Sequence, residues 1–392
     1  MTYRPLVRAA AAVVTVLATA LPLGAPAHAG PGDPWVRAWG ENNSGQLGNG
    51  STIDQYTPAP VKGLAREDVR ELTSGGWTAD QVFALALLND GTVQSWGGNV
   101  NGQLGDGTTV NRGFPGAVAG LSGVTDIAAG LDFALALRGG RVLSWGRDAN
   151  GQLGDGAPDA AAPVTRPVPV QSLNKVKEIA AGCQFGVALR DDGTVWTWGR
   201  NHEGQLGDGS TTDRSTPRRV PGLADVVAVS AGCRHVLALT ADHTVKAWGR
   251  NGNGELGDDS TQASPLPVDV AHLDGVTRIF AAPYHNHALL DDGSVRAWGW
   301  NKSGQLGDGT AVSRTTPVPV TGLIGVTSLV GGYGFTVALL DDQSVVAWGE
   351  NDLGQLGDGT AAASLSPVLT LPPGSGTTRL ATAIAWKSGF AY

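Results

Sequence analysis

The chain has 392 residues, which allows one large domain or two ordinary ones. It carries 27 lysines and arginines against 35 aspartates and glutamates, a formal net charge of −8 with no basic run. Nucleic acid is therefore not expected as a partner, because clustered Lys and Arg supply most of that affinity. The 58 glycines and 22 prolines would suggest disorder if they were scattered, but they recur at fixed places in a chain that is 41% apolar.

The first 29 residues have the pattern of a signal peptide. Arg4 and Arg8 precede an apolar run over residues 9–23, and an Ala-His-Ala sequence ends at Ala29. A membrane anchor is the competing interpretation, but the run is shorter than the roughly 20 apolar residues that a span needs. We therefore predict cleavage after Ala29, secretion, and one folded domain over residues 30–392 without a membrane span.

Trp-Gly pairs recur along the rest of the chain at intervals of about 50 residues. Each pair is followed by a loop with the sequence GQLGDG or a close variant. The tryptophans of the seven pairs are Trp39, Trp96, Trp145, Trp198, Trp248, Trp298 and Trp348. A period of this length is typical of repeat architectures, so it decides the fold class before local detail does.

Within one unit the sequence predicts four short antiparallel strands. Residues 176–182 and 185–192 are apolar, residues 194–199 alternate as a half-buried strand does, and residues 216–223 are polar with the prolines that an edge strand tolerates. Asp192-Gly193 suits a tight hairpin turn, because both residues tolerate positive φ. Four such strands repeated seven times predict an all-β, seven-bladed β-propeller.

The two ends of the chain predict how the ring of blades closes. Residues 384–392 resemble the first two strands of a unit, and residues 32–40 resemble the turn and third strand that would follow. Together the N- and C-terminal strands complete one blade, and this closure leaves no open sheet edge.

The units resemble those of the regulator of chromosome condensation family. The shared features are an inner strand ending in Ala-Gly, an Ala-Leu strand, an Asp-Gly turn, the Trp-Gly pair and the GQLGDG-type loop. The resemblance covers residues 33–392 and implies a seven-bladed propeller. It implies little about activity, because these propellers serve as platforms for many partners.

The glycine-rich loop is predicted to be scaffold and not a phosphate site. Phosphate loops need a following Lys and Ser/Thr or a βαβ context, whereas Gly207-Asp208-Gly209 continues into Ser, Thr and Pro. We expect Asp208 to bond the local backbone, Leu206 to pack between blades and the Trp198 indole to lie beside Gly199.

No set of residues predicts catalysis, a metal site or a cofactor. His235 and His285 stand where other units carry phenylalanine, so we expect both in the core. His287 lies two residues further, but no Cys or carboxylate partner stands at ligand spacing. Carboxylate pairs such as Asp191-Asp192 lie at turns, where adjacent side chains point apart. We therefore expect a protein without enzymatic activity.

Cys183 and Cys233 directly follow the first strands of neighbouring units. Equivalent positions of adjacent blades approach each other near the axis. The pair predicts either a disulfide, if the Cα atoms come within about 4.4–6.8 Å, or two reduced residues that line the axis. Export would favour oxidation.

The turns between first and second strands are where the units differ most. They share one face with the GQLGDG-type loops, at the mouth of the central channel, and four of the seven carry Trp or Tyr. Aromatic rings among polar groups are typical of a protein-binding hot spot, while the alternative is that they plug the axis as core. The predicted partner-binding residues are Trp77, Asp80, Leu131, Gln184, Arg234, Tyr284, Asn286, Tyr333, Trp386 and Lys387.

These features predict a secreted, monomeric, non-catalytic platform for a protein partner of unknown identity. The resemblance suggests two further hypotheses. One secreted bacterial member of the family inhibits β-lactamases and uses aromatic residues on the same face, although this chain has fewer of them. Guanine-nucleotide exchange, the activity of a eukaryotic member, is disfavoured by predicted export, acidic charge and the lack of a basic N-terminal arm.

Overall fold

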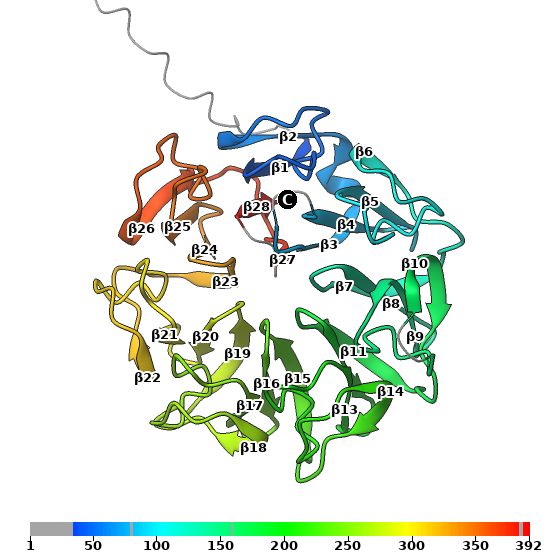
Figure 1. Ribbon diagram of the computed structural model, residues 1–392. Helices are drawn as coiled ribbons and strands as arrows, with labels where there is room; N and C mark the ends of the chain where they lie inside the picture. The colour runs from blue at the N-terminus through cyan, green and yellow to red at the C-terminus, as the bar shows by residue number, and fades with distance from the viewer. Residues whose placement is uncertain (1–33, 79–80, 158–159, 384–386) are drawn as a thin grey trace, which may run out of the picture.

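The computed structural model describes residues 34–78, 81–157, 160–383 and 387–392. The strands of these residues form seven sheets around a central axis (Figure 1). Five sheets have four antiparallel strands, as predicted for a blade, and the other two meet where the ring closes. The predicted all-β, seven-bladed propeller is confirmed. No helix of the described residues has the length and apolar character to cross a membrane.

We number the blades 1 to 6 from β3 onward and name the one containing β1 and β2 the closing blade. The innermost strands of blades 1–6 are β3 (Val69–Gly75), β7 (Val124–Ala129), β11 (Val176–Ala181), β15 (Val226–Ala231), β19 (Val276–Ala281) and β23 (Val326–Gly331). The second strands are β4 (Phe83–Leu88), β8 (Phe133–Arg138), β12 (Phe185–Arg190), β16 (His235–Thr240), β20 (His285–Leu290) and β24 (Phe335–Leu340).

The third strands end at or just beyond the Trp-Gly pair, and the fourth strands lie at the rim. The third strands are β5 (Val93–Gly97), β9 (Arg141–Asp148), β13 (Val195–Gly199), β17 (Val245–Gly249), β21 (Val295–Gly299) and β25 (Val345–Gly349). The outer strands are β6 (Arg112–Ala117), β10 (Ala160–Pro169), β14 (Arg214–Arg219), β18 (Ser264–Asp269), β22 (Arg314–Pro319) and β26 (Ser364–Leu371).

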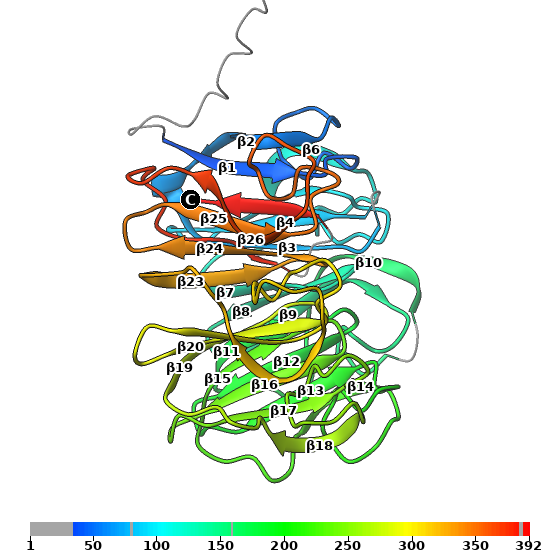
Figure 2. The ribbon, with the colours of Figure 1, turned by 90° about the vertical axis from the view of Figure 1, so that its left-hand side faces the viewer.

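The closing blade joins the two ends of the chain. β1 (Trp35–Gly40) pairs with β2 (Gln55–Ala65) on one side and with β28 (Ser388–Ala391) on the other, with Ala38 opposite Phe390. Figure 2 shows the ring from its side, with β1 and β2 beside the marked C-terminus. The predicted closure by N- and C-terminal strands is therefore confirmed, and a one-turn 3-10 helix, η1 (Arg66–Asp68), leads into β3.

The innermost strand of the closing blade differs from the prediction. Residues 384–386, which the sequence assigns to it, lie outside the described residues. The antiparallel partner of the last residues lies earlier in the chain, where Leu380 bridges to Ala391 and the Tyr392 N–H donates to the Arg379 carbonyl at 3.0 Å. β27 (Thr382–Ala383) then runs parallel to β3 of blade 1, so the closing region is bonded to the next blade through the backbone.

The hydrophobic core lies between the blades. Leu206, from the loop of blade 3, packs with Phe185 of its own blade and with Val229 and Trp248 of blade 4. This arrangement confirms the predicted place of Leu206. Because each apolar cluster between the blades combines two neighbouring sheets, no blade can bury its own faces without a neighbour on each side.

A hydrogen bond from each tryptophan of the Trp-Gly pairs joins neighbouring blades. The Trp248 indole Nε1 donates to the Gln205 carbonyl in the loop of blade 3 at 3.0 Å, and Trp198 donates to Gln152 at 2.9 Å. The same bond recurs from Trp39, Trp96, Trp145, Trp298 and Trp348. The Trp198 indole packs on Gly154 of the preceding blade.

The glycine-rich loops are held by their own side chains. In blade 3, Asn201 donates from Nδ2 to the Ser210 and Thr212 carbonyls, and its Oδ1 accepts from the Leu206 N–H at 2.9 Å. Asp208 Oδ1 accepts from the Ser210 N–H at 3.0 Å, as predicted. These bonds hold the backbone of the blade 3 loop in place from within the loop.

Candidate functional site

The mouth of the propeller is built from pairs of side chains, one pair per blade. In each blade, the residue after the Trp-Gly pair donates its N–H to the carbonyl of the residue at or just before the start of the second strand, as Arg200 does to Gln184 at 2.9 Å. We call these the mouth pairs: Lys387–Glu41, Val82–Gly98, Asp132–Arg147, Gln184–Arg200, Arg234–Arg250, Tyr284–Trp300 and Gly334–Glu350. The backbone bond places the two predicted loops on one face, as expected, while the side chains differ from blade to blade.

A second series of backbone bonds links the turns of blades 2 to 5. The N–H of Leu131 donates to the Cys183 carbonyl at 2.9 Å, that of Cys183 to Cys233 at 3.1 Å, and that of Cys233 to Pro283 at 3.2 Å. Pro283 has no N–H, so the series cannot continue into blade 6. Pro283, and not Tyr284, is thus the equivalent of the two cysteines, and Tyr284 lies one residue further along.

The structure joins Cys183 to Cys233 in a disulfide with a Cα–Cα distance of 4.4 Å. Of the two alternatives that the sequence leaves open, the oxidised pair is the one present. Trp77, Leu131 and Tyr284 pack against the disulfide. Together with Gln184 and Arg234 these residues line a pocket of about 160 Å³ at the mouth.

Aromatic rings from three blades meet beside this pocket. The Trp77 ring of blade 1 lies 5.8 Å from Tyr284 of blade 5 and 5.3 Å from Tyr333 of blade 6, in edge-to-face geometry. Trp300 lies 6.2 Å from Tyr284 and 5.1 Å from Tyr333. All four rings are half-buried, so they pack against one another and still present surface. The sequence reasoning missed Trp300, although it occupies the position at which blades 3 and 4 carry arginine.

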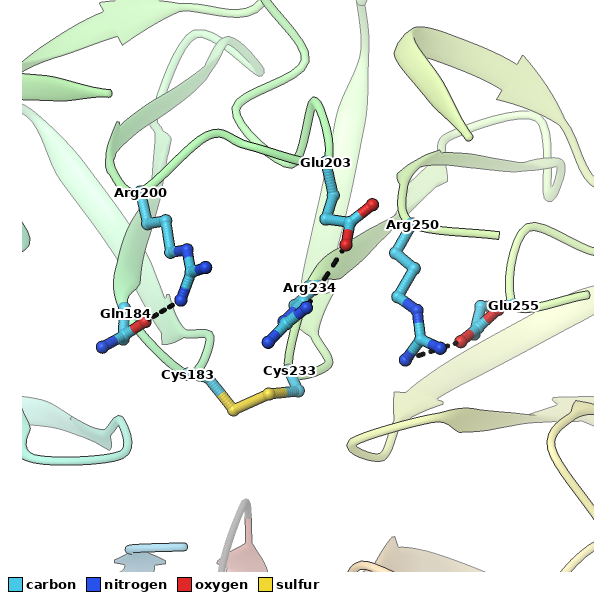
Figure 3. Close-up of a disulfide and its surroundings, with 8 residues drawn as sticks. All are labelled: Cys183, Gln184, Arg200, Glu203, Cys233, Arg234, Arg250 and Glu255. Atoms are coloured by element: carbon cyan, nitrogen blue, oxygen red, sulfur yellow. Dashed lines mark hydrogen bonds and ion pairs between the residues drawn. A yellow bond between two sulfur atoms is a disulfide. The ribbon is translucent and has the colours of Figure 1, made fainter. Parts of the chain in front are cut away.

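Arg200, Arg234 and Arg250 lie around the disulfide (Figure 3). Arg147 stands at the position of blade 2 that is equivalent to Arg200. We call these four residues the cationic arc: Arg147, Arg200, Arg234 and Arg250. Three of its members form ion pairs, Arg147–Asp132 at 3.3 Å, Arg234–Glu203 at 3.2 Å and Arg250–Glu255 at 3.6 Å. The Arg250 guanidinium also lies 4.8 Å from the centre of the Tyr284 ring, a cation–π contact that joins the arc to the aromatic cluster.

Two predicted contact residues are structural supports. Asn286 is fully buried, donating from Nδ2 to the Glu255 carbonyl at 2.8 Å while its Oδ1 lies 2.7 Å from His235 Nε2. Its inward position on β20 places it beneath the mouth and removes it from the surface. Lys387 is also largely buried; although burial opposes its charge, the neighbouring carboxylates, with Asp352 Oδ2 at 2.7 Å, raise the pKa of Lys387.

The remaining predicted contact residues divide into two groups. Trp77, Leu131, Gln184, Arg234, Tyr284 and Tyr333 come together at the mouth with partly exposed side chains. Asp80 and Trp386 lie outside the described residues.

Two histidines, His235 and His285, are core residues, as their equivalence to phenylalanine predicts. His235 and His285 are buried, and His285 Nε2 lies 2.9 Å from the Thr336 hydroxyl. His287 is also buried, and desolvation lowers the pKa of His287 to about 3. Among the described residues no group of His, Cys, Asp and Glu is arranged to hold a metal ion.

Carboxylates that the sequence reasoning did not single out line the central channel. Asp126 and Glu178 stand at the same position of successive innermost strands, beside a cavity of about 230 Å³. Asp126 Oδ2 accepts from the Ile179 N–H at 2.9 Å, and Glu178 Oε1 accepts from the Val229 N–H at 3.1 Å, so each bonds the next blade. Burial raises the pKa of Asp126 to about 6 and that of Glu178 to about 7.

The propeller with its repeated tryptophan bonds defines a class of repeat scaffold proteins, and comparison with known families identifies which one. The family model for the RCC1-like domain matches residues 160–391, and the model for the regulator of chromosome condensation (RCC1) repeat matches residues 36–79 and 90–137. The chain belongs to the RCC1-like family.

Similar proteins share parts of this chain. The human E3 ubiquitin-protein ligase HERC2 is 34% identical over 189 residues, which are 47% of this chain and 4% of the ligase. The Arabidopsis thaliana ultraviolet-B receptor UVR8 is 32% identical over 185 residues, which are 47% of this chain and 30% of the receptor. The match thus spans less than a third of either relative.

Solved structures share the fold over nearly the whole chain. Prp20p of Saccharomyces cerevisiae superposes with a TM-score of 0.79 at 20% identity, covering 93% of this chain and 92% of Prp20p. Human WBSCR16 superposes with a TM-score of 0.79 at 22% identity, covering 91% of this chain and 99% of that protein. At these identities the similarity establishes the fold alone.

Proposed function

We propose that this protein is a secreted, non-catalytic propeller that binds a protein partner at its mouth. The observation that carries the proposal is the contrast between two sets of equivalent positions. The tryptophan bonds repeat in every blade, whereas the mouth pairs change from charged to polar to aromatic around the ring. The fold does not require particular side chains at the mouth pairs, so binding of a partner can determine which residues stand there.

The chemistry of the mouth suits a protein surface. Trp, Tyr and Arg are the residues most enriched in binding hot spots, and all three meet here beside a pocket. Related folds provide precedent: Prp20p binds Gsp1p and histones, and Kap60 binds yeast RCC1 (Prp20).

The test is a pull-down from the secreted and cell-surface fractions of the producing culture. The mouth variant is W77A/Y284A/Y333A, and its matched control is Y56A/F114A/L369A, which removes exposed apolar side chains from the outer strands β2, β6 and β26. We expect wild type and control to capture a partner that the folded mouth variant loses. A partner retained by the mouth variant, or lost equally by the control, would refute the proposal.

Secretion is the second part of the proposal. It is supported by the pattern of residues 1–29 and by the disulfide, since disulfides persist in oxidising compartments and are rare in the cytosol. Edman sequencing of protein recovered from the culture medium should begin at Gly30. Protein found only inside cells, with its N-terminal segment intact, would contradict export.

A further inference from the structure

We infer that the pocket beside the disulfide receives one apolar side chain of the partner, while the cationic arc binds a carboxylate of the same segment. The occupant is then a polypeptide segment in which an aromatic or branched apolar residue adjoins Asp or Glu. The inference rests on the proposed function and specifies the chemistry that the mouth recognises.

The pocket fits a single apolar side chain. Its volume is about 160 Å³, and apolar cavities of about 150 Å³ accept a benzene-sized group. The disulfide and Leu131 contribute apolar atoms, and Trp77 and Tyr284 contribute ring surface. A ring entering the pocket would therefore meet apolar surface from several directions, while Gln184 and Arg234 add polar groups to the lining.

The arginine next to the pocket supplies the second half of the recognition. Arg200 contacts no carboxylate among the described residues: its Nη1 donates to Gln184 Oε1 at 2.6 Å, and its Nη2 lies 3.4 Å from His202 Nδ1. Its positive charge is thus uncompensated at close range. An incoming carboxylate could form the charge-assisted, bidentate pair for which the guanidinium geometry is suited.

Arg234 can join this interaction at little cost. Its ion pair with Glu203 leaves both side chains about one third exposed, and ion pairs in contact with solvent contribute little stability. The arc as a whole carries four arginines against the three carboxylates Asp132, Glu203 and Glu255. This side of the mouth is therefore locally cationic on a chain whose net charge is −8, which favours an acidic segment over a basic one.

The probes are three synthetic nonapeptides of otherwise identical Gly/Ser sequence, titrated by calorimetry into the protein recovered from the culture medium. The first has a central phenylalanine flanked by two aspartates. The second has asparagines in place of the aspartates, and the third has alanine in place of the phenylalanine. We expect the first peptide to bind at least about tenfold more tightly than either of the others, because each loses one half of the recognition.

Three variants locate the binding. R200Q/R234Q should abolish the preference for the aspartate peptide over the asparagine peptide. Its matched control, R218Q/R219Q, removes two exposed arginines from β14 of blade 3 and should leave the preference unchanged. L131W fills the pocket without changing charge and should abolish the preference for phenylalanine over alanine. Thermal unfolding checks that each variant is folded.

The outcomes separate this inference from the proposed function. Equal binding of the three peptides, binding of none, or an unchanged preference in R200Q/R234Q or L131W would overturn the inference. If the inference fails but the mouth variant does not capture the partner that wild type captures in the pull-down, the proposed function stands without the inference. If the control pair R218Q/R219Q loses the preference as well, general charge and not the arc attracts the peptide, and the inference is wrong.

Discussion

Gly207 and Trp248 show how one pair of residues joins two blades. Gly207 has φ +66°, and a Cβ atom there would lie 2.6 Å from Trp248 Nε1, the atom that donates to the Gln205 carbonyl. The glycine is therefore required twice, once by the backbone conformation and once by the close approach of the indole.

Substitution of Gly207 by alanine should cost more than an alanine at a comparable but open glycine. Gly222 has φ +73° with nothing within 4 Å of a built Cβ, so G222A carries only the backbone cost, roughly 1–2 kcal/mol. We expect G207A to lower the free energy of unfolding by about 1–3 kcal/mol more, through overpacking against Trp248. Urea unfolding of the two variants measures the difference, and equal losses would show that the indole contact contributes nothing.

His287 is a polar residue at a position where other blades are apolar. The equivalent residues of blades 1, 2 and 4 are Leu85, Leu135 and Leu237, whereas His287 Nε2 is buried and no described residue bonds it. An unsatisfied buried polar atom costs about 1–3 kcal/mol.

H287L should therefore stabilise the protein, and more strongly in acid. Burial holds the folded-state pKa of His287 at about 3, below its ordinary 6.5, so the unfolded chain binds a proton that the folded chain does not. Wild-type stability thus falls as the pH decreases from about 6.5, by about 2 kcal/mol at pH 5, and H287L lacks this loss. Denaturant unfolding at pH 8 and pH 5 measures both effects. A stabilisation that does not grow in acid would show that His287 titrates normally.

At the scale of secondary structure, the innermost strands carry the opposite pH dependence. Burial raises the folded-state pKa of Glu178 to about 7 from an ordinary value of 4.5. The folded state therefore binds the proton more tightly. The stability that this provides is fully present below about pH 4.5 and is lost as the pH rises through about 7.

E178Q should remove that dependence. Gln can still accept from the Val229 N–H through Oε1, but it cannot ionise. The difference in free energy of unfolding between E178Q and wild type should shift in favour of E178Q by on the order of 3 kcal/mol between pH 4.5 and pH 8.5. Paired urea titrations at the two pH values test this, with E203Q, at the partly exposed Glu203 of the mouth, as the matched control. Parallel wild-type and E178Q profiles would contradict it.

The turns of blades 3 and 4 are linked by both a disulfide and a backbone bond between the same two residues. Cys183 and Cys233 are 50 residues apart, and in the chain-entropy treatment a loop of that length gives about 4 kcal/mol. We expect C183A/C233A to lose about that much free energy of unfolding, so that it unfolds at a lower urea concentration than wild type. Reductant should leave the unfolding of this variant unchanged. A wild-type midpoint unchanged by dithiothreitol, once thiol titration shows full reduction, would count against this estimate.

At the scale of the whole molecule, stability depends on closing the ring. β28 supplies the partner of β1, and the backbone N–H of Leu72 in blade 1 donates to the Tyr392 hydroxyl at 3.1 Å. The last five residues thus contact both the closing blade and its neighbour.

Deletion of residues 388–392 should lower the thermal midpoint by roughly 10 °C or more, because it removes the buried Phe390 and Tyr392 and exposes an edge of β1. The control inserts five Gly/Ser residues at the exposed Pro373–Gly374 turn, which lengthens a surface loop at little cost. If the deletion variant and the control have the same thermal midpoint, the ring does not need β28 for its stability.

The propeller fold could be predicted from the sequence because the residues that determine it act locally and are repeated. The Trp-Gly pairs, the Asp-Gly turns and the alternation of residues 194–199 each act over a few residues, and seven copies reinforce one another. The closure of the ring by N- and C-terminal strands was predictable for the same reason, since each end carries a recognisable part of a unit.

The mouth depends on distances between blades, which no local pattern specifies. Trp77 and Tyr333 are far apart in the chain and meet only because the ring brings blades 1 and 6 to one axis. The inward position of Asn286, the bond between Cys183 and Cys233 and the pairing of Trp300 with Tyr284 were likewise decided in space. The sequence by itself determined the repeated scaffold, because short-range periodicity encodes strands and turns. Only the tertiary structure decided the pocket, the cationic arc and the channel carboxylates, because ring geometry sets which equivalent residues come within contact.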